Sequence, residues 1–452
     1  MAKIISILII CAISFIPVTA QAQTGGSETI GNNLNLDQAI CTALKNNPNV
    51  DAMLRTIEKS EYLYKAASKE WLPAVTLDYT FTGFPTIPEL TIEGTDTSGG
   101  SDKTPLTDST SFVLGAHVKM PIYTAGAIES RKDMAKFGVD VARLRYLETR
   151  ADFIQEVTIN YLNVLRLQNY SVVTFSNLKR FIEHEDNTSA YFETGLVAKN
   201  ALLEIRSKRS IADQDVIEVE KDLRIARAAL NVTMGVDIES EFILADVTGL
   251  KEVSYSIGEC FELAKEKNPS LSVYAYLKRI AAAAIDLERS DMWPHVFGEI
   301  DYFKHGKTPA LRGDDYLTND IVMGVVKADW KVFDWFKTVD LVKARKKEAA
   351  ILADKMRSVE DKVALDIRQS YLSMKAGKNK LAVAERAIEY AEENYRISKL
   401  RYEERVAKST EVNDALVLLE RSKFNYYAAF YEYSVSIAKL ERVVGLAVER
   451  YE

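Results

Sequence analysis

Few side chains in this sequence are placed to do chemistry. The four histidines, at positions 117, 184, 295 and 305, do not form a metal-binding cluster. His184-Glu185 opens a string similar to the metalloprotease motif H-E-x-x-H, but Thr188 stands where the second histidine is needed. We find no G-x-S-x-G nucleophile motif and no phosphate-binding glycine loop. We therefore expect no catalytic residue, no metal and no cofactor, and place His305 in a loop.

Two carboxylates form the most informative charged pair. Glu411 and Asp414 are three residues apart, so they share one face of a helix that we predict to start at residue 409. The plain interpretation is structural. Ser409 or Thr410 caps the helix, and Glu411 lies in its first turn, an arrangement worth about 1 kcal/mol.

The start of the chain is typical of an exported protein. We predict a signal peptide over residues 1–22, because Lys3 precedes an apolar run, 4–16, and Ala20-Gln21-Ala22 is a typical cleavage site. The mature chain is then 23–452. No later stretch approaches 18 consecutive apolar residues, so a membrane crossing would not use helices.

Charge and cysteine usage exclude two further classes. The 452-residue chain has a formal charge of −7, which argues against nucleic-acid binding. Cys41 and Cys260 remain after export, too few for a disulfide scaffold. Each suits a helix face as a small apolar residue, and pairing between them stays open.

The sequence is duplicated. Leu36–Pro48 returns as Ile257–Pro269, and the offset of 221 residues between the two prolines holds again for Pro73 and Pro294. Farther along the chain the offset is 210, for Tyr161 and Tyr371 and for Gly235 and Gly445. A constant offset over several landmarks indicates an internal repeat. The change of offset places the extra residues of the first half inside the segment 85–110. The predicted repeats span 34–236 and 255–446.

Apolar residues recur at helical spacing over long stretches. No proline or glycine interrupts residues 139–194, and a helix of about 65 residues is about 100 Å long. Such an element needs partners along its whole length, as in a coiled coil or bundle. The predicted helices span 36–70, 127–192, 199–234, 257–292, 337–401 and 409–444.

Between the helices the apolar period changes from 3.6 to 2. Val75, Leu77, Tyr79 and Phe81, for example, alternate with polar residues. The length and the single apolar face are typical of transmembrane β-strands, although a surface hairpin of a soluble protein alternates in the same way. The predicted strands span 75–84, 111–122, 295–304 and 320–331.

Aromatic residues mark the helix–strand junctions and favour the membrane interpretation. All four tryptophans lie there, as an aromatic belt at a membrane interface would require. Four strands do not enclose a lumen, and open strand edges are not tolerated in lipid, so the chain must oligomerise, with two or three copies equally compatible. The predicted belt comprises Trp71, Trp293, Trp330, Trp335 and Tyr123.

Together these features resemble the TolC-like outer-membrane efflux proteins over nearly the whole mature chain. The resemblance rests on the order and duplication of several motifs. They are Leu36–Pro48, the strand entry Trp71-Leu72-Pro73, the strand exit Pro121-Ile122-Tyr123 with Gly126, and the paired helix breaks Gly195–Lys199 and Arg405–Lys408. Glu404-Arg405 and Asp334-Trp335-Phe336 depart from the family, which has glycines there, so the geometry of these two turns is left open.

The resemblance implies a mainly α-helical homotrimer with four β-strands per chain. The strands would close a 12-stranded β-barrel in outer-membrane lipids and continue into a periplasmic helical tunnel. The function implied is a passive exit duct that docks to a periplasmic adaptor protein and an inner-membrane pump of RND or ABC type. The alternative is a periplasmic or surface helical scaffold without a pore.

The resemblance also implies a gate and a docking edge. Glu411 and Asp414 would form a carboxylate ring at the closed periplasmic mouth, which opens like an iris and selects cations. Tyr402 and Arg405 would hold neighbouring hairpins together. Apolar hairpin tips suit docking of an adaptor, although a simple hairpin cap explains them too. The predicted docking residues are Gly195, Leu196, Val197, Lys199, Val406, Ala407 and Lys408.

Overall fold

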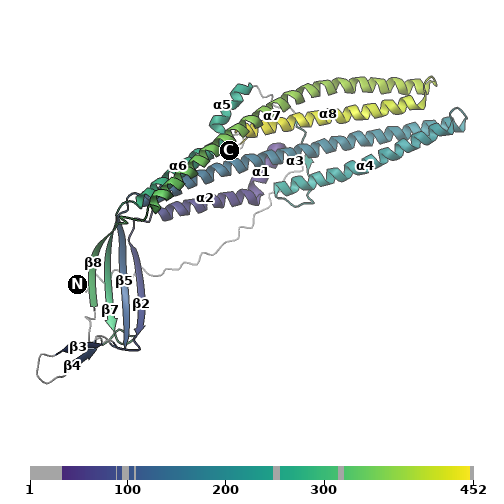
Figure 1. The fold of residues 1–452 in the computed structure, drawn as a ribbon. Helices are drawn as coiled ribbons and strands as arrows, with labels where there is room; N and C mark the ends of the chain where they lie inside the picture. The colour runs from purple at the N-terminus through teal and green to yellow at the C-terminus, as the bar shows by residue number, and fades with distance from the viewer. Residues whose placement is uncertain are drawn as a thin grey trace.

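The protein is an elongated molecule with a β-sheet at one end and long helices running away from it (Figure 1). The computed structural model describes residues 33–87, 89–93, 101–105, 108–247, 255–313 and 320–447. The predicted signal peptide lies outside these residues. Among the described helices, none is long and apolar enough to span a membrane.

Two helical hairpins form the body far from the sheet. The first consists of α3 (Ala127–Glu193) and α4 (Lys199–Met234), the second of α7 (Lys337–Glu403) and α8 (Ser409–Val444). Helices α3 and α7 have 67 residues each, about 100 Å at 1.5 Å per residue, which confirms the predicted length. The hairpins lie side by side, with α8 packed on α3.

The shorter helices correct the prediction of single helices over 36–70 and 257–292. Each is two helices, α1 (Leu36–Asn46) with α2 (Pro48–Ala67), and α5 (Ile257–Lys267) with α6 (Pro269–Ser290). The proline has no N–H and disfavours the helical conformation of the residue before it. The preceding asparagine is therefore extended, and it caps the second helix.

These two asparagines fasten several helix ends at once. Asn268 Oδ1 accepts a hydrogen bond from Ser270 N at the start of α6, while its Nδ2 donates to Val443 O at the end of α8, at 2.7 Å. Asn47 caps α2 in the same way, and its Nδ2 lies 3.5 Å from Thr233 O. The repeated Asn-Pro therefore joins three helices in each half.

The main sheet contains four antiparallel strands in the order β2-β5-β7-β8. Strands β2 and β8 are its open edges. β7 includes His305, so the prediction of a loop at this residue is wrong. Two smaller pairs accompany it, β1 with β6 and β3 with β4. The strands are β1 (Asn33–Leu34), β2 (Ala74–Gly83), β3 (Glu89–Glu93), β4 (Ser101–Pro105), β5 (Thr110–Tyr123), β6 (Ile243–Leu244), β7 (His295–Gly306) and β8 (Asp320–Asp329).

The strand register puts apolar residues on one face of the sheet. Leu77, Ala116, Tyr302 and Val322 are paired in sequence across the four strands, so their side chains share a face. Leu77 and Val322 are more than 70% exposed in the single chain, at 74% and 72%. An apolar face of this extent needs lipid or another protein surface to cover it.

The largest apolar core lies in the middle of the helical body. It includes Ile40 of α1 and Val157 and Tyr161 of α3, all fully buried. The Tyr161 hydroxyl lies 2.9 Å from Leu34 O and 2.6 Å from Ala245 O, next to the β1–β6 pair. Cys41 and Cys260 are free thiols, one exposed and one buried.

Gly445, which ends α8, provides a test of these helix junctions. Its φ of +92° favours glycine, and a Cβ there would lie 2.5 Å from Lys267 O. We expect Gly445→Ala to lower the free energy of unfolding by more than about 1 kcal/mol, measured by thermal unfolding in detergent.

Gly138→Ala, near the start of α3, is the matched control. No atom lies within 4 Å of its added Cβ, so alanine should stabilise the helix by up to about 1 kcal/mol. Equal melting temperatures for the two variants would contradict the proposed role of Gly445.

Candidate functional site

The two hairpin tips share a backbone conformation although their sequences differ. Two residues after the end of α3, Gly195 has a φ of +73°, and two residues after the end of α7, Arg405 has a φ of +64°. In both tips the next residue donates a 2.8 Å hydrogen bond five residues back, Leu196 N to Tyr191 O and Val406 N to Arg401 O. Arg405 thus keeps the turn geometry at a conformational cost of about 1 kcal/mol or more.

A buried polar cluster joins the two hairpins of one chain near the tips. The Tyr402 hydroxyl lies 3.0 Å from Thr188 Oγ1, and the Tyr402 ring packs edge-on against His184. His184 Nε2 lies 2.9 Å from Ser409 Oγ. Burial lowers the pKa of His184 to about 4, so the imidazole is neutral at pH 7.

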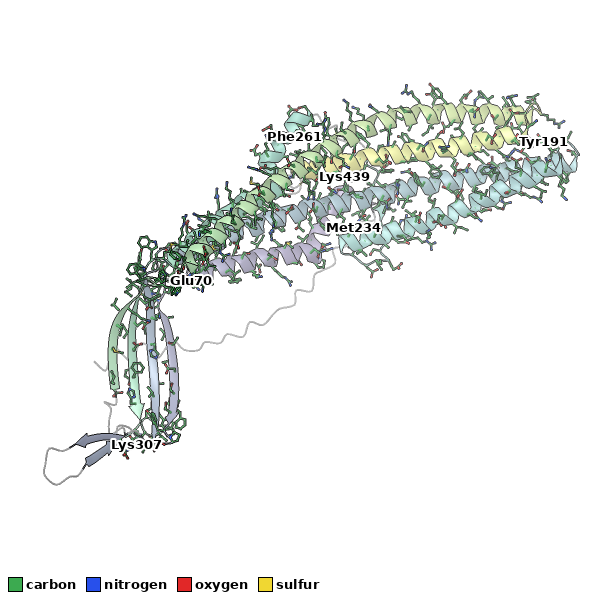
Figure 2. The ribbon with its side chains drawn as sticks, in the orientation of Figure 1. Glu70, Tyr191, Met234, Phe261, Lys307 and Lys439 are labelled. Atoms are coloured by element: carbon green, nitrogen blue, oxygen red, sulfur yellow. The ribbon has the colours of Figure 1, made fainter. Side chains whose placement is uncertain are left out.

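Arg405 belongs to the same cluster. Its guanidinium lies 5.8 Å from the ring centroid of Tyr191, which in turn is 5.6 Å from the ring of Tyr402. Figure 2 labels Tyr191 at the tip of the hairpins. Tyr402 and Arg405 therefore contact the neighbouring hairpin of their own chain.

Of the two carboxylates, only Glu411 has a polar contact among the residues that the structure describes. Glu411 accepts hydrogen bonds from Lys408 N and Arg401 Nη1, each at 3.2 Å. The expected cap at Ser409 or Thr410 is wrong: α8 already begins at Ser409, whose hydroxyl contacts His184. Asp414 is exposed and has no hydrogen-bonding partner within the described ranges.

In a coiled coil with a seven-residue repeat, both carboxylates share a face of α8 with residues that line a groove farther along the helix. The groove, about 750 Å³, has α8 as its floor and α3 and α7 as its walls. Glu432, Lys439 and Arg442 line the groove. Glu432 and Lys439 follow Glu411, and Arg442 follows Asp414, by multiples of seven residues. The helical wall is therefore concave on the side that carries both carboxylates.

The predicted docking residues surround the hairpin ends. Leu196 and Val406 are exposed at 52% and 66%, and Lys199 and Lys408 are exposed beside them. Val197 and Ala407 are half-buried, next to the residues that precede α4 and α8. The tips thus present a small apolar surface with two lysines.

The predicted aromatic belt lies at the junction between the sheet and the helices, beside the labelled Glu70 in Figure 2. Trp335 and Phe336 have φ of +56° and +64°, like their counterparts Ala125 and Gly126 at +50° and +85°. The turn before α7 lacks a glycine, but it has the same backbone conformation as the turn before α3. Belt residues flanking this junction are Trp71, Tyr123, Trp293, Trp330 and Trp335.

The polar face of the sheet contains a cluster that the sequence did not reveal. His117 of β5 contacts Asp301 of β7 at 2.6 Å and Asp78 of β2 at 2.7 Å. A Cβ on Gly115 would lie 2.5 Å from Asp78 Oδ1, so this glycine makes room for the cluster. The cluster ties three strands together.

Exposed apolar residues form a stripe on each outer helix of the wall. On α4 they recur about every seven residues and on α7 at intervals of seven or eleven, and neither stripe has a partner within the described chain. The α4 stripe comprises Leu203, Ile211, Ile217, Ile225 and Val232. The α7 stripe includes Leu365, Leu372, Val383, Tyr390 and Ile397.

A sheet with an apolar face, continued by a wall of long helices with a charged concave side, defines a membrane channel subunit. The family described as outer membrane efflux protein matches residues 39–236 and 261–446. The chain belongs to this family and is an outer-membrane efflux channel. Channels of this family are trimeric components of tripartite efflux systems and are not enzymes.

The same fold occurs in several solved channels. The chain is similar to the outer-membrane channel OprN, with a TM-score of 0.77, 15% identity, and coverage of 91% of this chain and 89% of that one. VceC from Vibrio cholerae gives a TM-score of 0.76 at 12% identity, with coverage of 91% of this chain and 96% of that one. The Campylobacter jejuni CmeC channel gives a TM-score of 0.78 at 14% identity, with coverage of 91% of this chain and 86% of that one. No curated protein sequence matches the chain.

Tyr402→Phe tests the polar cluster between the hairpins. The change removes the hydroxyl that contacts Thr188 and should lower the free energy of unfolding by about 1 kcal/mol, measured by thermal unfolding. Thr188 keeps its bond to His184 O at 2.8 Å, so no donor is left unpaired. Tyr62→Phe, at an exposed position of α2, should have no effect; equal losses in both variants would contradict this role.

Proposed function

We propose that three copies of this chain close into an exit duct that crosses the outer membrane and extends into the periplasm. The signal peptide, 1–22, directs export. The mature chain, 23–452, is one duct subunit built from the repeats 34–236 and 255–446. Outer-membrane lipids cover the apolar face of the sheet, and the aromatic belt lies at the membrane interface.

The unpartnered edges support the trimer. The stripes on α4 and α7 lie at opposite edges of the wall, as β2 and β8 lie at opposite edges of the sheet. Contact between the α7 edge of one copy and the α4 edge of the next is heterologous, and it closes a ring when the rotation fits. Three copies give twelve strands, enough to enclose a lumen.

The tips form the gate in this proposal. The observation that carries it is the position of Asp414, which is exposed, unpaired among the described residues, and on the concave side of the wall next to the hairpin tips. Three copies bring three such carboxylates, with Glu411 beside each, around the mouth. Converging carboxylates attract cations and exclude anions. Opening requires the Tyr402 and Arg405 contacts to break.

The tips also provide the docking surface for a periplasmic adaptor protein. Leu196 and Val406 offer apolar contacts, and Lys199 and Lys408 add positive charge at the rim. The adaptor then connects the duct to an inner-membrane pump of the RND or ABC type. This arrangement assigns the energy-consuming step to the pump and leaves the duct passive.

Asp414→Asn combined with Glu411→Gln tests the gate. Glutamine retains an acceptor for Lys408 N, so α8 stays capped while the charge is removed. We expect the cation preference in planar bilayers to fall several-fold, because three copies lose up to six carboxylates. Glu266→Gln, at an exposed position of α5, is the control. Unchanged ion selectivity in the double variant would reject the gate.

Leu196→Asp combined with Val406→Asp tests the docking edge. Burying two new carboxylates in an apolar contact should weaken adaptor binding by at least about tenfold, measured with purified proteins. Ile238→Asp, at an exposed position beyond the far end of α4, should bind normally. If all three proteins bind the adaptor equally, docking occurs elsewhere.

A further inference from the structure

A half-buried carboxylate, Glu420, lies in the interface between the two hairpins, which we call the seam. Asn177 of α3 donates from Nδ2 to Glu420 Oε2 of α8 at 2.6 Å. Asn177 is only 3% exposed, and its Oδ1 is buried without a hydrogen-bonding partner within the described residues. An unmatched buried acceptor is costly, so this contact needs a further explanation.

The same arrangement occurs a second time, nearer to the tips. Asn413 of α8 donates from Nδ2 to Glu204 Oε1 of α4 at 3.3 Å, again across the seam. Asn413 is 1% exposed, and its Oδ1 is also without a partner in the part of the chain described. Both pairs thus combine a carboxylate with an amide that has an unused acceptor.

A proton on Glu420 would satisfy every group of the first pair. An ionised carboxylate only accepts hydrogen bonds, so it leaves Asn177 Oδ1 unmatched. A protonated carboxyl group donates one O–H, and it forms a two-bond ring with an amide: O–H to Oδ1, and Nδ2–H to the other carboxyl oxygen. The unused acceptor of the buried amide therefore matches the O–H that only the neutral acid provides.

We propose that Glu420 is a proton-binding site of the seam, which holds a proton while α3 and α8 are packed and releases it to water as they separate. The consequence for conduction, though not the proton site itself, rests on the proposed opening at the tips. Separation of the hairpins is then linked to pH.

The charged surroundings of Glu420 support this assignment. Burial, with a smaller contribution from Asp215 of α4, raises the pKa of Glu420 from 4.5 to about 7. α3 presents the neutral amide of Asn177. On the α7 side, Glu392 is paired with Lys423 at 2.7 Å.

The sign of the effect follows from this raised pKa. The packed seam binds the proton more tightly than the separated one, so its stability is greatest below about pH 4.5 and is lost as the pH rises through about 7. His184 acts in the opposite direction. Its pKa is lowered to about 4, so protonation destabilises the packed seam as the pH falls from 6.5 to 4. The two titrations therefore compensate each other in the native protein.

Hydrogen exchange of α8 residues 409–424 in the full-length trimer measures seam separation directly. We expect wild-type protection, corrected for intrinsic exchange rates, to change little between pH 5 and 8. In His184→Gln only Glu420 titrates. The equilibrium constant for separation of the seam should therefore increase by almost two orders of magnitude per protomer from pH 5 to 8. Glu420→Gln retains both hydrogen bonds and leaves only His184 to titrate. In this variant the seam should separate more as the pH falls. The double variant should be independent of pH.

Infrared spectra provide the second readout. Wild-type protein at pH 6 should show a protonated-carboxyl band that Glu420→Gln abolishes, whereas Glu432→Gln, at an exposed partner of Lys380, retains it. The proposal is wrong if Glu420→Gln keeps this band, or if His184→Gln shows no loss of protection at high pH. If the seam of His184→Gln separates at high pH as expected while the conductance of the same variant does not change with pH, the proton site is supported and the gate at the tips is rejected.

Discussion

A wall that is one helix thick cannot cover both of its edges within a single chain. α3 lies between α4 and α8 and buries side chains along its length, whereas α7, equally long, keeps an exposed apolar stripe. The sheet has the same problem, because β2 and β8 leave backbone groups unpaired. β2 follows α2 and β8 leads into α7, so each open edge continues from the sheet into the helices. Closure by further copies is thus required over the full length of the molecule.

Duplication meets this requirement with two similar halves, which retain backbone conformation more strictly than residue type. Gly195 and Arg405 have the same left-handed conformation, as do Gly126 and Phe336. A bulky residue in that region is strained, so the surrounding hydrogen bonds and packing must hold it there. Glycine is kept where backbone also approaches closely, as at Gly445 beside Lys267 O.

The sequence predicted the long helices and the strands because both have strong periodicity and few interruptions. It failed at Asn47-Pro48 and Asn268-Pro269, where a single residue divides a helix without disturbing the apolar pattern. In the site, Tyr402 was found through a family resemblance, but His184, Thr188 and Asn177 were not. These are polar residues buried by contacts more than 200 positions apart, and no local pattern records such a partner.

The distribution of apolar and polar contacts suits a duct that opens at one end. The middle of the helical body is held by a continuous apolar core around Tyr161 and by the Asn268 junction. Towards the tips, side-chain hydrogen bonds add to a smaller apolar cluster, and each contributes only about 1 kcal/mol net because water competes for the same groups. Local separation therefore costs least at the tips. The hairpins can part there while the junction with the sheet remains packed.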